Sequence, residues 1–253
     1  MIGSGGALGR KTDQGVAGHA ASTLQRPGSV PQPDEQQMHG EPFKAVILDC
    51  DGVLFDSASA NLAFYTSVLD ALGEPPLSAE HEQRIHALSS EQLFEGLFGG
   101  DPARRAEASR VAASVDYRPF FGLMVPVEGL HEILADLRRS YRLAMATNRG
   151  RTIPDLLREF GLERAFDTVV GITDVPRPKP HPDMLFECAR RLGLASDEAV
   201  YVGDTNADRD AAAAAGMSFI GVGNRCEHPV LIPHICELRR ILAFLRDGGT
   251  REP

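Results

Sequence analysis

Five short apolar runs, separated by segments of helical periodicity, constrain the fold of this chain more than any other feature. Each run is bounded by polar residues, as is typical of buried strands; the runs cover residues 44–48, 142–146, 168–172, 199–202 and 219–222. Apolar side chains recur at helical spacing between them, at 127–140, 153–160, 183–192 and 207–215. Strands that alternate with helices predict an α/β fold with a Rossmann-like, doubly wound parallel sheet covered on both faces.

The interval from residue 58 to residue 125 breaks this alternation. It contains helix-like stretches separated by GEPP, GGDP and YRPFFG, and it has no convincing strand pattern. A connection of this length between two strands of one sheet is unusual. We therefore expect a small helical cap domain at 58–125, inserted into a core built from 42–57 and 126–253.

Residues 1–41 differ from the rest of the chain in composition. They are rich in Gly, Ser, Gln and Pro and carry few bulky apolar side chains. Such a segment buries too little surface to offset its ordering entropy, so we expect a disordered leader at 1–41. The segment lacks the apolar stretch of a signal peptide, and Met38 offers an alternative start just before the first apolar run.

Charge and cysteine usage exclude some classes of function. The 26 Lys and Arg residues against 35 Asp and Glu give a formal net charge of −9, which disfavours nucleic acid as a partner. The absence of a long apolar run disfavours a membrane location. The four cysteines show no C-x-x-C spacing, which favours a reduced, cytoplasmic setting over a disulfide framework or a zinc site; they are Cys50, Cys188, Cys226 and Cys236.

Polar side chains stand where the predicted strands end and in one proline-flanked loop. They are Asp49 and Asp51 after the first run, Thr147 and Asn148 after the second, Lys179 in the loop PRPKPHP, and Asp204 and Asp208 in GDTNADRD. Ligands of open α/β sheets bind beyond the carboxyl ends of the strands. We therefore expect these side chains to converge on one edge of the sheet.

Three of these carboxylates, Asp49, Asp51 and Asp204, would raise one another's pKa if they came close together. A hard divalent cation removes that repulsion, and carboxylate oxygens with a backbone carbonyl are the ligands that Mg²⁺ prefers. A calcium-binding EF-hand loop is excluded, because Leu54 stands where that loop needs Gly and Ala60 stands where it needs Glu.

Lys179, Thr147 and Asn148 add a positive charge and hydrogen-bond donors to the predicted metal site. Together with the metal they form a pocket for a tetrahedral dianion, so we expect a phosphate group as ligand. Each of these residues is ordinary by itself: a lone Lys is usually a solvated charge, and a lone Thr is usually a strand-end residue. The hypothesis rests on the whole set occurring in order.

The ordered set resembles the haloacid dehalogenase superfamily. DCDGVLFDS is similar to its first motif, Thr147 in TN to the second, Lys179 in RPKPHPDM to the third, and GDTNAD to the fourth. The resemblance covers residues 42–223 and is greatest to phosphoglycolate phosphatase-like members, which carry a helical cap after the first motif. Val53 departs from the Thr that is commoner at this position.

The resemblance implies a mechanism residue by residue. Asp49 would attack phosphorus and form an aspartyl-phosphate, which divides one hard displacement into two easier ones. Asp51 would protonate the leaving oxygen and later take a proton from the hydrolytic water. Lys179 would hold Asp49 ionised and contact the phosphate, and Thr147 and Asn148 would bind phosphate oxygens.

The resemblance also implies a magnesium site. The side chains of Asp49 and Asp204 and the main-chain carbonyl of Asp51 would hold Mg²⁺. Asp208 would orient groups near the metal without binding it directly.

The function that the resemblance implies is a Mg²⁺-dependent phosphatase for a small phosphorylated metabolite, phosphoglycolate-like or sugar-phosphate-like. A sugar phosphomutase is the alternative, and a receiver-like signalling module is a more remote one. Dehalogenation is disfavoured by Asp51, and phosphonate cleavage by the lack of any Lys in 58–125. The cap offers several side chains for substrate contact, namely Tyr65, Arg84, His86, Arg104, Arg105, Arg110 and Arg118. The oligomeric state is not predicted.

Overall fold

The structure is a computed structural model, and it describes residues 43–85 and 88–246, without the side chains of residues 83 and 84. The leader predicted at 1–41, the alternative start at Met38 and the last residues of the predicted core lie outside this part of the chain.

A parallel sheet is the centre of the fold. Its strands are β1 (Ala45–Leu48), β4 (Arg142–Thr147), β5 (Thr168–Gly171), β6 (Ala199–Gly203), β7 (Ser218–Val222) and β8 (Leu231–Ile232). They stand in the order β5-β4-β1-β6-β7-β8, and each pairs in parallel with its neighbours. The five predicted strands are therefore confirmed, and β1 lies between β4 and β6.

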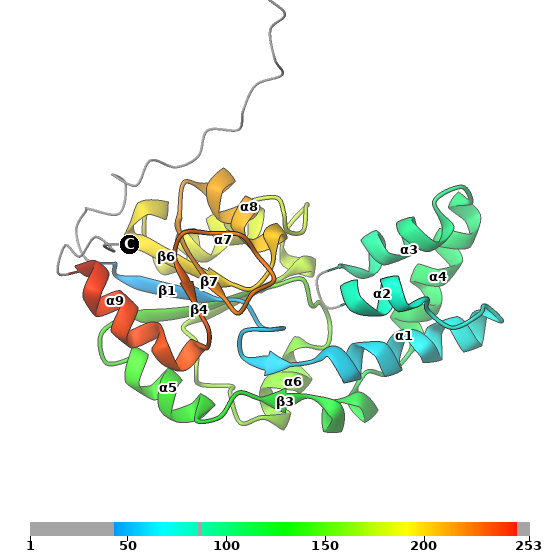
Figure 1. Ribbon diagram of the computed structural model, residues 1–253, viewed down its shortest axis with the longest axis horizontal. Coiled ribbons are helices and arrows are strands. Elements are labelled where there is room, and N and C mark those ends of the chain that lie inside the picture. The colour runs from blue at the N-terminus through cyan, green and yellow to red at the C-terminus, as the bar shows by residue number, and fades with distance from the viewer. Residues whose placement is uncertain (1–42, 86–87, 247–253) are drawn as a thin grey trace, which may run out of the picture. The chain divides into compact units, whose positions relative to one another are not determined.

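Alternate side chains of β1 serve two hydrophobic layers. Val46 and Leu48 belong to one buried cluster, and Ala45 and Ile47 belong to the other. Helices α7 (Asp183–Leu192) and α8 (Asn206–Ala215) supply the second cluster, whereas α5 (Leu130–Leu137), α6 (Ile153–Glu159) and α9 (Leu238–Arg246) supply the first. Figure 1 shows α7 and α8 on one side of the sheet and α5 on the other. The doubly wound α/β architecture is thus confirmed, because a parallel sheet must bury both faces.

Helix α5 is shorter than the helix predicted at 127–140. The amide of Val127 donates to the carbonyl of Leu54 at 3.0 Å, which holds this residue beside the first motif instead of in a helix. Gly129 has φ +71°, a left-handed conformation that a helix does not contain, so α5 begins only at Leu130. The prediction was wrong at both ends because periodicity alone does not locate these breaks.

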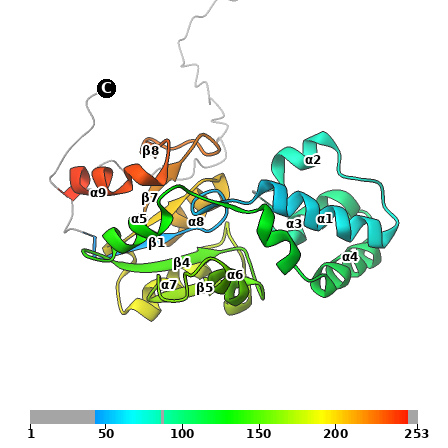
Figure 2. The same ribbon diagram turned by 90° about the horizontal axis from the view of Figure 1, so that it is seen from below.

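The described residues between Asp56 and Val125 form helices joined by turns and loops. These are α1 (Ala58–Leu72), α2 (Ala79–Arg84), α3 (Ser90–Phe98), α4 (Pro102–Ser114) and a 3₁₀ turn at Arg118–Leu123. Helix α4 packs against α1 and α3, as Figure 2 shows. A short antiparallel pair, β2 (Phe55–Asp56) with β3 (Val125–Pro126), joins the two ends of the insert. The use of 58–125 as a cap domain stays a prediction.

The ends of the insert helices are fixed by local sequence. Ser89 and Gln92 form a reciprocal capping box at the start of α3, at 3.2 Å and 2.8 Å. Asp101 caps α4 by accepting from the amide of Arg104 at 3.0 Å, and Pro102 occupies its first turn, where no amide hydrogen is needed.

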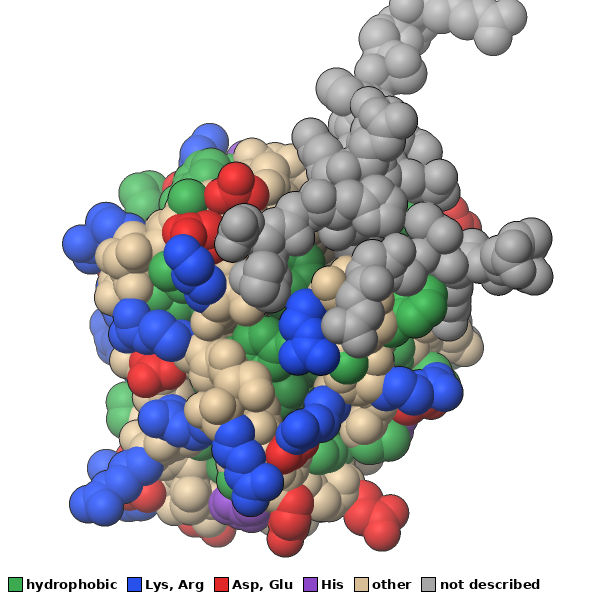
Figure 3. Space-filling view, turned by 90° about the vertical axis from the view of Figure 1, so that its left-hand side faces the viewer, with side chains coloured by type: hydrophobic (Ala, Val, Ile, Leu, Met, Phe, Trp, Pro, Cys, Tyr) green, Lys and Arg blue, Asp and Glu red, His purple; other side chains and the backbone are tan. Residues whose placement is uncertain are grey.

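Charged side chains of both signs cover the surface that Figure 3 shows. On this face, Lys and Arg are spread among Asp, Glu and apolar side chains instead of gathering in one basic patch. Within the described ranges, none of the helices combines the length and the apolar character that crossing a membrane requires.

Candidate active site

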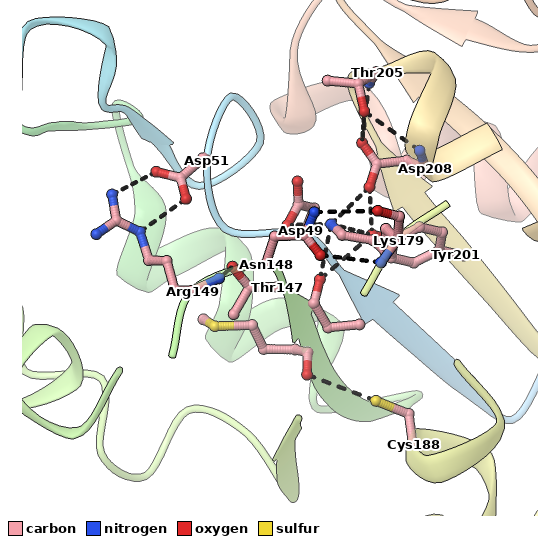
Figure 4. Close-up of polar contacts among 12 residues, drawn as sticks. Asp49, Asp51, Thr147, Asn148, Arg149, Lys179, Cys188, Tyr201, Thr205 and Asp208 are labelled. Atoms are coloured by element: carbon pink, nitrogen blue, oxygen red, sulfur yellow. Dashed lines mark hydrogen bonds and ion pairs between the residues drawn. The ribbon is translucent and has the colours of Figure 1, made fainter. Parts of the chain in front are cut away.

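The carboxyl ends of three adjacent strands place the predicted side chains next to one another. Asp49 follows β1, Thr147 ends β4, and Asp204 follows β6. Because β1 pairs with both β4 and β6, these three ends are neighbours at one edge of the sheet. Figure 4 shows Asp49, Lys179 and Asp208 pointing toward one another in this region.

Lys179 is the centre of the cluster. Its Nζ lies 2.8 Å from Oδ1 of Asp49 and 2.7 Å from Oδ1 of Asp208, and it donates to the hydroxyl of Tyr201 at 2.9 Å. The residue is only 3% exposed. Burial by itself would lower the pKa of Lys179, but the carboxylates of Asp208 and Asp49 outweigh it and raise the pKa above its usual value. The two carboxylates therefore favour the positively charged form of Lys179.

Asp49, Asp204 and Asp208 form a buried carboxylate group. One oxygen from each lies within 4.8 Å of the others. Burial raises the pKa of Asp49 well above its usual value; Lys179 opposes this shift, while Asp208 and Asp204 add to it. Lys179 therefore compensates only part of the negative charge, and the site favours a further cation.

One oxygen of Asp204 has no hydrogen-bond partner in the part of the chain that the structure describes. Its Oδ2 accepts from Nη1 of Arg225 at 2.9 Å, whereas its Oδ1 is buried without a hydrogen-bond donor among the described residues. Burial and the charge of Asp208 raise the pKa of Asp204 to about 7, although Arg225 lowers it. A buried carboxylate oxygen left without a donor is costly, and it is a ready ligand for a hard cation.

Gly52 makes room for this carboxylate. Its φ is +80°, and a Cβ at this position would lie 2.0 Å from Oδ2 of Asp204. The first motif therefore needs Gly for two reasons, the left-handed backbone and the close approach of Asp204.

The oxygens of Asp208 are already occupied. Oδ1 accepts from Lys179 and from the hydroxyl of Tyr201, each at 2.7 Å. Oδ2 accepts from the amide of Thr205 at 3.0 Å and from its hydroxyl at 2.5 Å. Burial would raise the pKa of Asp208, but Lys179 and these donors lower it below its usual value. A carboxylate so fully bonded is suited to fix Lys179 and the start of α8.

Thr147 and Asn148 shape the loops around Lys179. Oδ1 of Asn148 accepts from the amide of Lys179 at 3.1 Å, and its Nδ2 donates to the carbonyl of Lys179 at 3.4 Å. The hydroxyl of Thr147 accepts from the amide of Arg149 at 3.1 Å. Both residues line the same cavity as Asp49.

Asp51 is turned toward Arg149, a residue that the sequence interpretation did not single out. Nε of Arg149 donates to Oδ2 of Asp51 at 2.8 Å, and Nη2 donates to Oδ1 at 2.6 Å (Figure 4). Burial would raise the pKa of Asp51, but Arg149 outweighs it, so that the pKa is lowered. Asp51 is therefore held as a carboxylate, apart from the cluster around Lys179.

Three residues of the site, Arg149, Tyr201 and Arg225, were missed from the sequence. Arg149 follows Asn148 directly, so its place in the loop after β4 was a usable signal. For Tyr201 the sequence signal was weaker: a tyrosine in a wholly buried strand needs a hydrogen-bond partner for its hydroxyl, which points to polar neighbours. Arg225 gave none, since its loop follows β7 without a recognisable pattern.

A cavity of about 530 Å³ lies over the cluster, a volume suited to a small ligand. The core lines it with Asp49, Asp51, Thr147 and Lys179, and the insert lines it with residues that include Ser90, Tyr65, Tyr117 and Arg118. Of the insert side chains suggested for substrate contact, Tyr65 and Arg118 therefore reach the cavity. Arg104 is bonded to Glu74 and Glu107, and Arg105 pairs with Glu95. Arg110 is not among the lining residues, and the side chains of Arg84 and His86 lie outside the described part.

The comparisons with known proteins agree with this geometry. The family model of haloacid dehalogenase-like hydrolases matches residues 46–222, more than half of the chain. The probable phosphatase IndB of Dickeya dadantii (strain 3937) is 36% identical over 189 residues, which cover 70% of this chain and 80% of that protein. A phosphoglycolate phosphatase of Nitrosococcus oceani is 30% identical over 198 residues, covering 73% of this chain and 86% of that protein.

One solved structure is similar to this chain in both sequence and fold. The crystal structure of a HAD-superfamily hydrolase, subfamily IA, variant 1, from Geobacter sulfurreducens PCA is 36% identical and has a TM-score of 0.64. It covers 80% of this chain and 98% of that chain. The residues matched by the family model run from β1 to the end of β7 and include Asp49, Lys179 and Asp204. The chain therefore belongs to the family of haloacid dehalogenase-like hydrolases.

Proposed function

We propose that this protein is a Mg²⁺-dependent phosphatase that hydrolyses a small phosphorylated metabolite, phosphoglycolate-like or sugar-phosphate-like, through an aspartyl-phosphate. The observation that carries the proposal is Asp49, a buried carboxylate paired with Lys179 at the base of a cavity of about 530 Å³. A carboxylate whose pKa is strongly shifted by burial and by a charged partner, and which lies in a cavity, is typical of a functional site. The likeness to phosphatases supports the same reaction.

Asp49 is the nucleophile of the proposed reaction. One of its oxygens bonds to phosphorus while the bond from phosphorus to the leaving oxygen breaks. Lys179 keeps Asp49 ionised and offsets charge on the phosphoryl oxygens. Thr147, at the end of β4, and Asn148, directly after it, bind those oxygens. Asp51 is a carboxylate while both of its oxygens accept from Arg149, so its acid role requires that it first takes up a proton when the substrate binds. It then donates this proton to the leaving oxygen and accepts another from the water that hydrolyses the aspartyl-phosphate.

The residues present fit a magnesium ion. Asp204 has a buried oxygen to which none of the described residues donates a hydrogen bond, and the single positive charge of Lys179 does not compensate the negative charges around Asp49. The side chains of Asp49 and Asp204 and the main-chain carbonyl of Asp51 would hold the ion, while Asp208 fixes Lys179. When bound, Mg²⁺ would neutralise carboxylate charge and align the phosphoryl group.

Metal removal tests both the reaction and the cofactor. Purified protein treated with a chelator is expected to lose phosphate release on a panel of phosphorylated metabolites, and added Mg²⁺ is expected to restore it. A hexose 1-phosphate in the panel tests the phosphomutase alternative, because a mutase returns an isomeric sugar phosphate and little free phosphate. Phosphate release that is indifferent to chelator, or no release from any substrate, contradicts the proposal.

Replacing Gly52 with Ala is expected to weaken Mg²⁺ binding about tenfold or more, because the new Cβ displaces the Asp204 carboxylate. Isothermal calorimetry with Mg²⁺ measures the change. Gly73→Ala is the matched control: Gly73 also has a left-handed φ, +68°, but its Cβ would meet nothing within 4 Å. Equal losses of Mg²⁺ affinity in both variants would show that backbone strain, and not contact with Asp204, is responsible.

A cytoplasmic location is the remaining part of the proposal. The four cysteines Cys50, Cys188, Cys226 and Cys236 are all free thiols, and the first three are buried. Free thiols are the usual state in a reducing compartment.

A further inference from the structure

Arg149 is a buried cation of the cavity to which the proposed reaction gives no role of its own. Its side chain is 7% exposed, and it lines the same cavity as Asp49 and Lys179. Its guanidinium lies 4.8 Å from the ring centroid of Tyr117, over the ring. A guanidinium taken out of water to this extent needs acceptors for its donors, so each of its contacts is informative.

Some N–H groups of the Arg149 guanidinium have no hydrogen-bond acceptor among the described residues. Nε and Nη2 hold the two oxygens of Asp51, and Nη2 also donates to the hydroxyl of Tyr117 at 3.2 Å. Nη1 has no acceptor among the residues that the structure describes. Among the described residues, the fully buried side-chain nitrogen and oxygen atoms without a partner are Nε of Arg105 and Oδ1 of Asp204, so Nη1 of Arg149 is not fully buried. Nη1 therefore carries two N–H donors for which the described residues supply no acceptor, on a side chain that lines the cavity.

The other cations of the cavity are less suited to a second anion. Lys179 already forms ion pairs with Asp49 and Asp208. The side chain of Arg118 is 66% exposed and pairs with Asp116, and Arg151 is exposed. An anion bound by Arg149 would be shielded from water. The attraction between opposite charges is stronger in such a low-dielectric setting than in water.

The proposed chemistry brings the substrate close to one of these hydrogen bonds. Both oxygens of Asp51 accept from the guanidinium, and in the proposed reaction one of them also contacts the leaving oxygen of the substrate. A carboxylate oxygen can accept more than one hydrogen bond, so the leaving oxygen shares this acceptor with Arg149. The N–H group of Arg149 in that bond is therefore close to the leaving group.

We propose that Arg149 is a specificity-determining residue that binds a second negative charge on the leaving group of the substrate. This inference rests on the proposed function. It names the substrate class as short phosphate esters whose leaving group carries a carboxylate or a second phosphate close to the ester oxygen. A planar guanidinium matches either anion with paired hydrogen bonds, which an ammonium group cannot do.

Calorimetry with non-hydrolysable phosphonates tests the inference on the Mg²⁺-loaded protein. The charged probes are 3-phosphonopropanoate and propane-1,3-diphosphonate, and the uncharged comparison is propylphosphonate. The wild type is expected to bind at least one charged probe about tenfold or more tightly than propylphosphonate. The charged probe that binds more tightly identifies the anion as a carboxylate or a phosphate.

Two Arg→Met variants decide which cation is responsible. Arg149→Met is expected to remove the preference for the charged probe, and Arg149→Lys is expected to retain part of it. Arg118→Met changes the exposed cation of the same cavity and is expected to leave the preference within about twofold of the wild type. No preference in the wild type, a preference that survives in Arg149→Met, or one lost equally in Arg118→Met overturns the inference.

Phosphate release from 2-phosphoglycolate and from ethyl phosphate separates this inference from the proposed function. If the wild type releases phosphate but Arg149→Met lowers kcat/KM equally for both esters, Arg149 is structural and the phosphatase proposal stands. If neither ester is hydrolysed while the binding preference depends on Arg149, the recognition of an anion stands and the proposed reaction fails.

Discussion

Asp49→Asn is expected to reduce phosphate release by about 10⁴-fold or more, the range seen when an enzyme loses its nucleophile. Asparagine has nearly the same volume as aspartate and can still accept a hydrogen bond from Lys179, which contacts Asp49 at 2.8 Å. It lacks the anionic oxygen that attacks phosphorus. Mass spectrometry of acid-quenched enzyme should find a phosphorylated peptide containing Asp49 in the wild type and none in the variant.

The loss of turnover is expected without a loss of folding. In the metal-free protein, Asp208 and Asp204 repel the Asp49 carboxylate, so a neutral amide at this position relieves repulsion. The unfolding midpoint of Asp49→Asn in chelator should therefore not fall below that of the wild type. Asp56→Asn, the same exchange at an exposed position of the following strand, should keep turnover within about twofold. Near-normal turnover in Asp49→Asn would rule out Asp49 as the nucleophile.

Much of the fold could be predicted from the sequence because strands buried in a parallel sheet have continuous apolar sequences. β1 is wholly buried from Ala45 to Leu48, so its run has no polar interruption. β8, at Leu231–Ile232, and the β2–β3 pair have only two residues per strand, too few to show a period. These short elements depend on a neighbouring strand, and tertiary pairing of that kind leaves no local pattern.

The candidate site could be predicted as a set of residues, but its pairings could not. Strand order brings Asp49, Thr147 and Asp204 to one edge of the sheet, so their convergence follows from topology. The pairing of Asp51 with Arg149 joins residues 98 positions apart, and it depends on side-chain directions that residue spacing does not contain. Arg225 pairs with Asp204 from a loop beyond β7, for the same reason without a local signal.

Lys179→Met is expected to destabilise the protein by about 3–5 kcal/mol as well as to abolish turnover, because it leaves buried carboxylates without their cation. Methionine fills a similar volume but cannot donate to Asp49, Asp208 or Tyr201, all of which contact Nζ within 3 Å. For a protein of this size the loss corresponds to an unfolding midpoint lower by about 10 °C. Lys44→Met is the matched control, since Lys44 pairs with Glu198 at the surface, where a pair contributes about 0–1 kcal/mol.

The pH dependence and a second variant distinguish lost charge from lost packing. Without Lys179, the folded-state pKa values of Asp49 and Asp208 rise, and a raised carboxylate pKa means stability that is lost as pH increases through it. The deficit of Lys179→Met, measured by urea unfolding, should therefore be larger at pH 8 than at pH 5. Combining Lys179→Met with Asp208→Asn removes one of the buried carboxylates that lack a cation. The double variant should therefore recover part of the lost free energy of unfolding. A deficit that is the same at both pH values and in the double variant would mean that Lys179 stabilises the site through its packing, and Asp49 would then need another source for its ionised state.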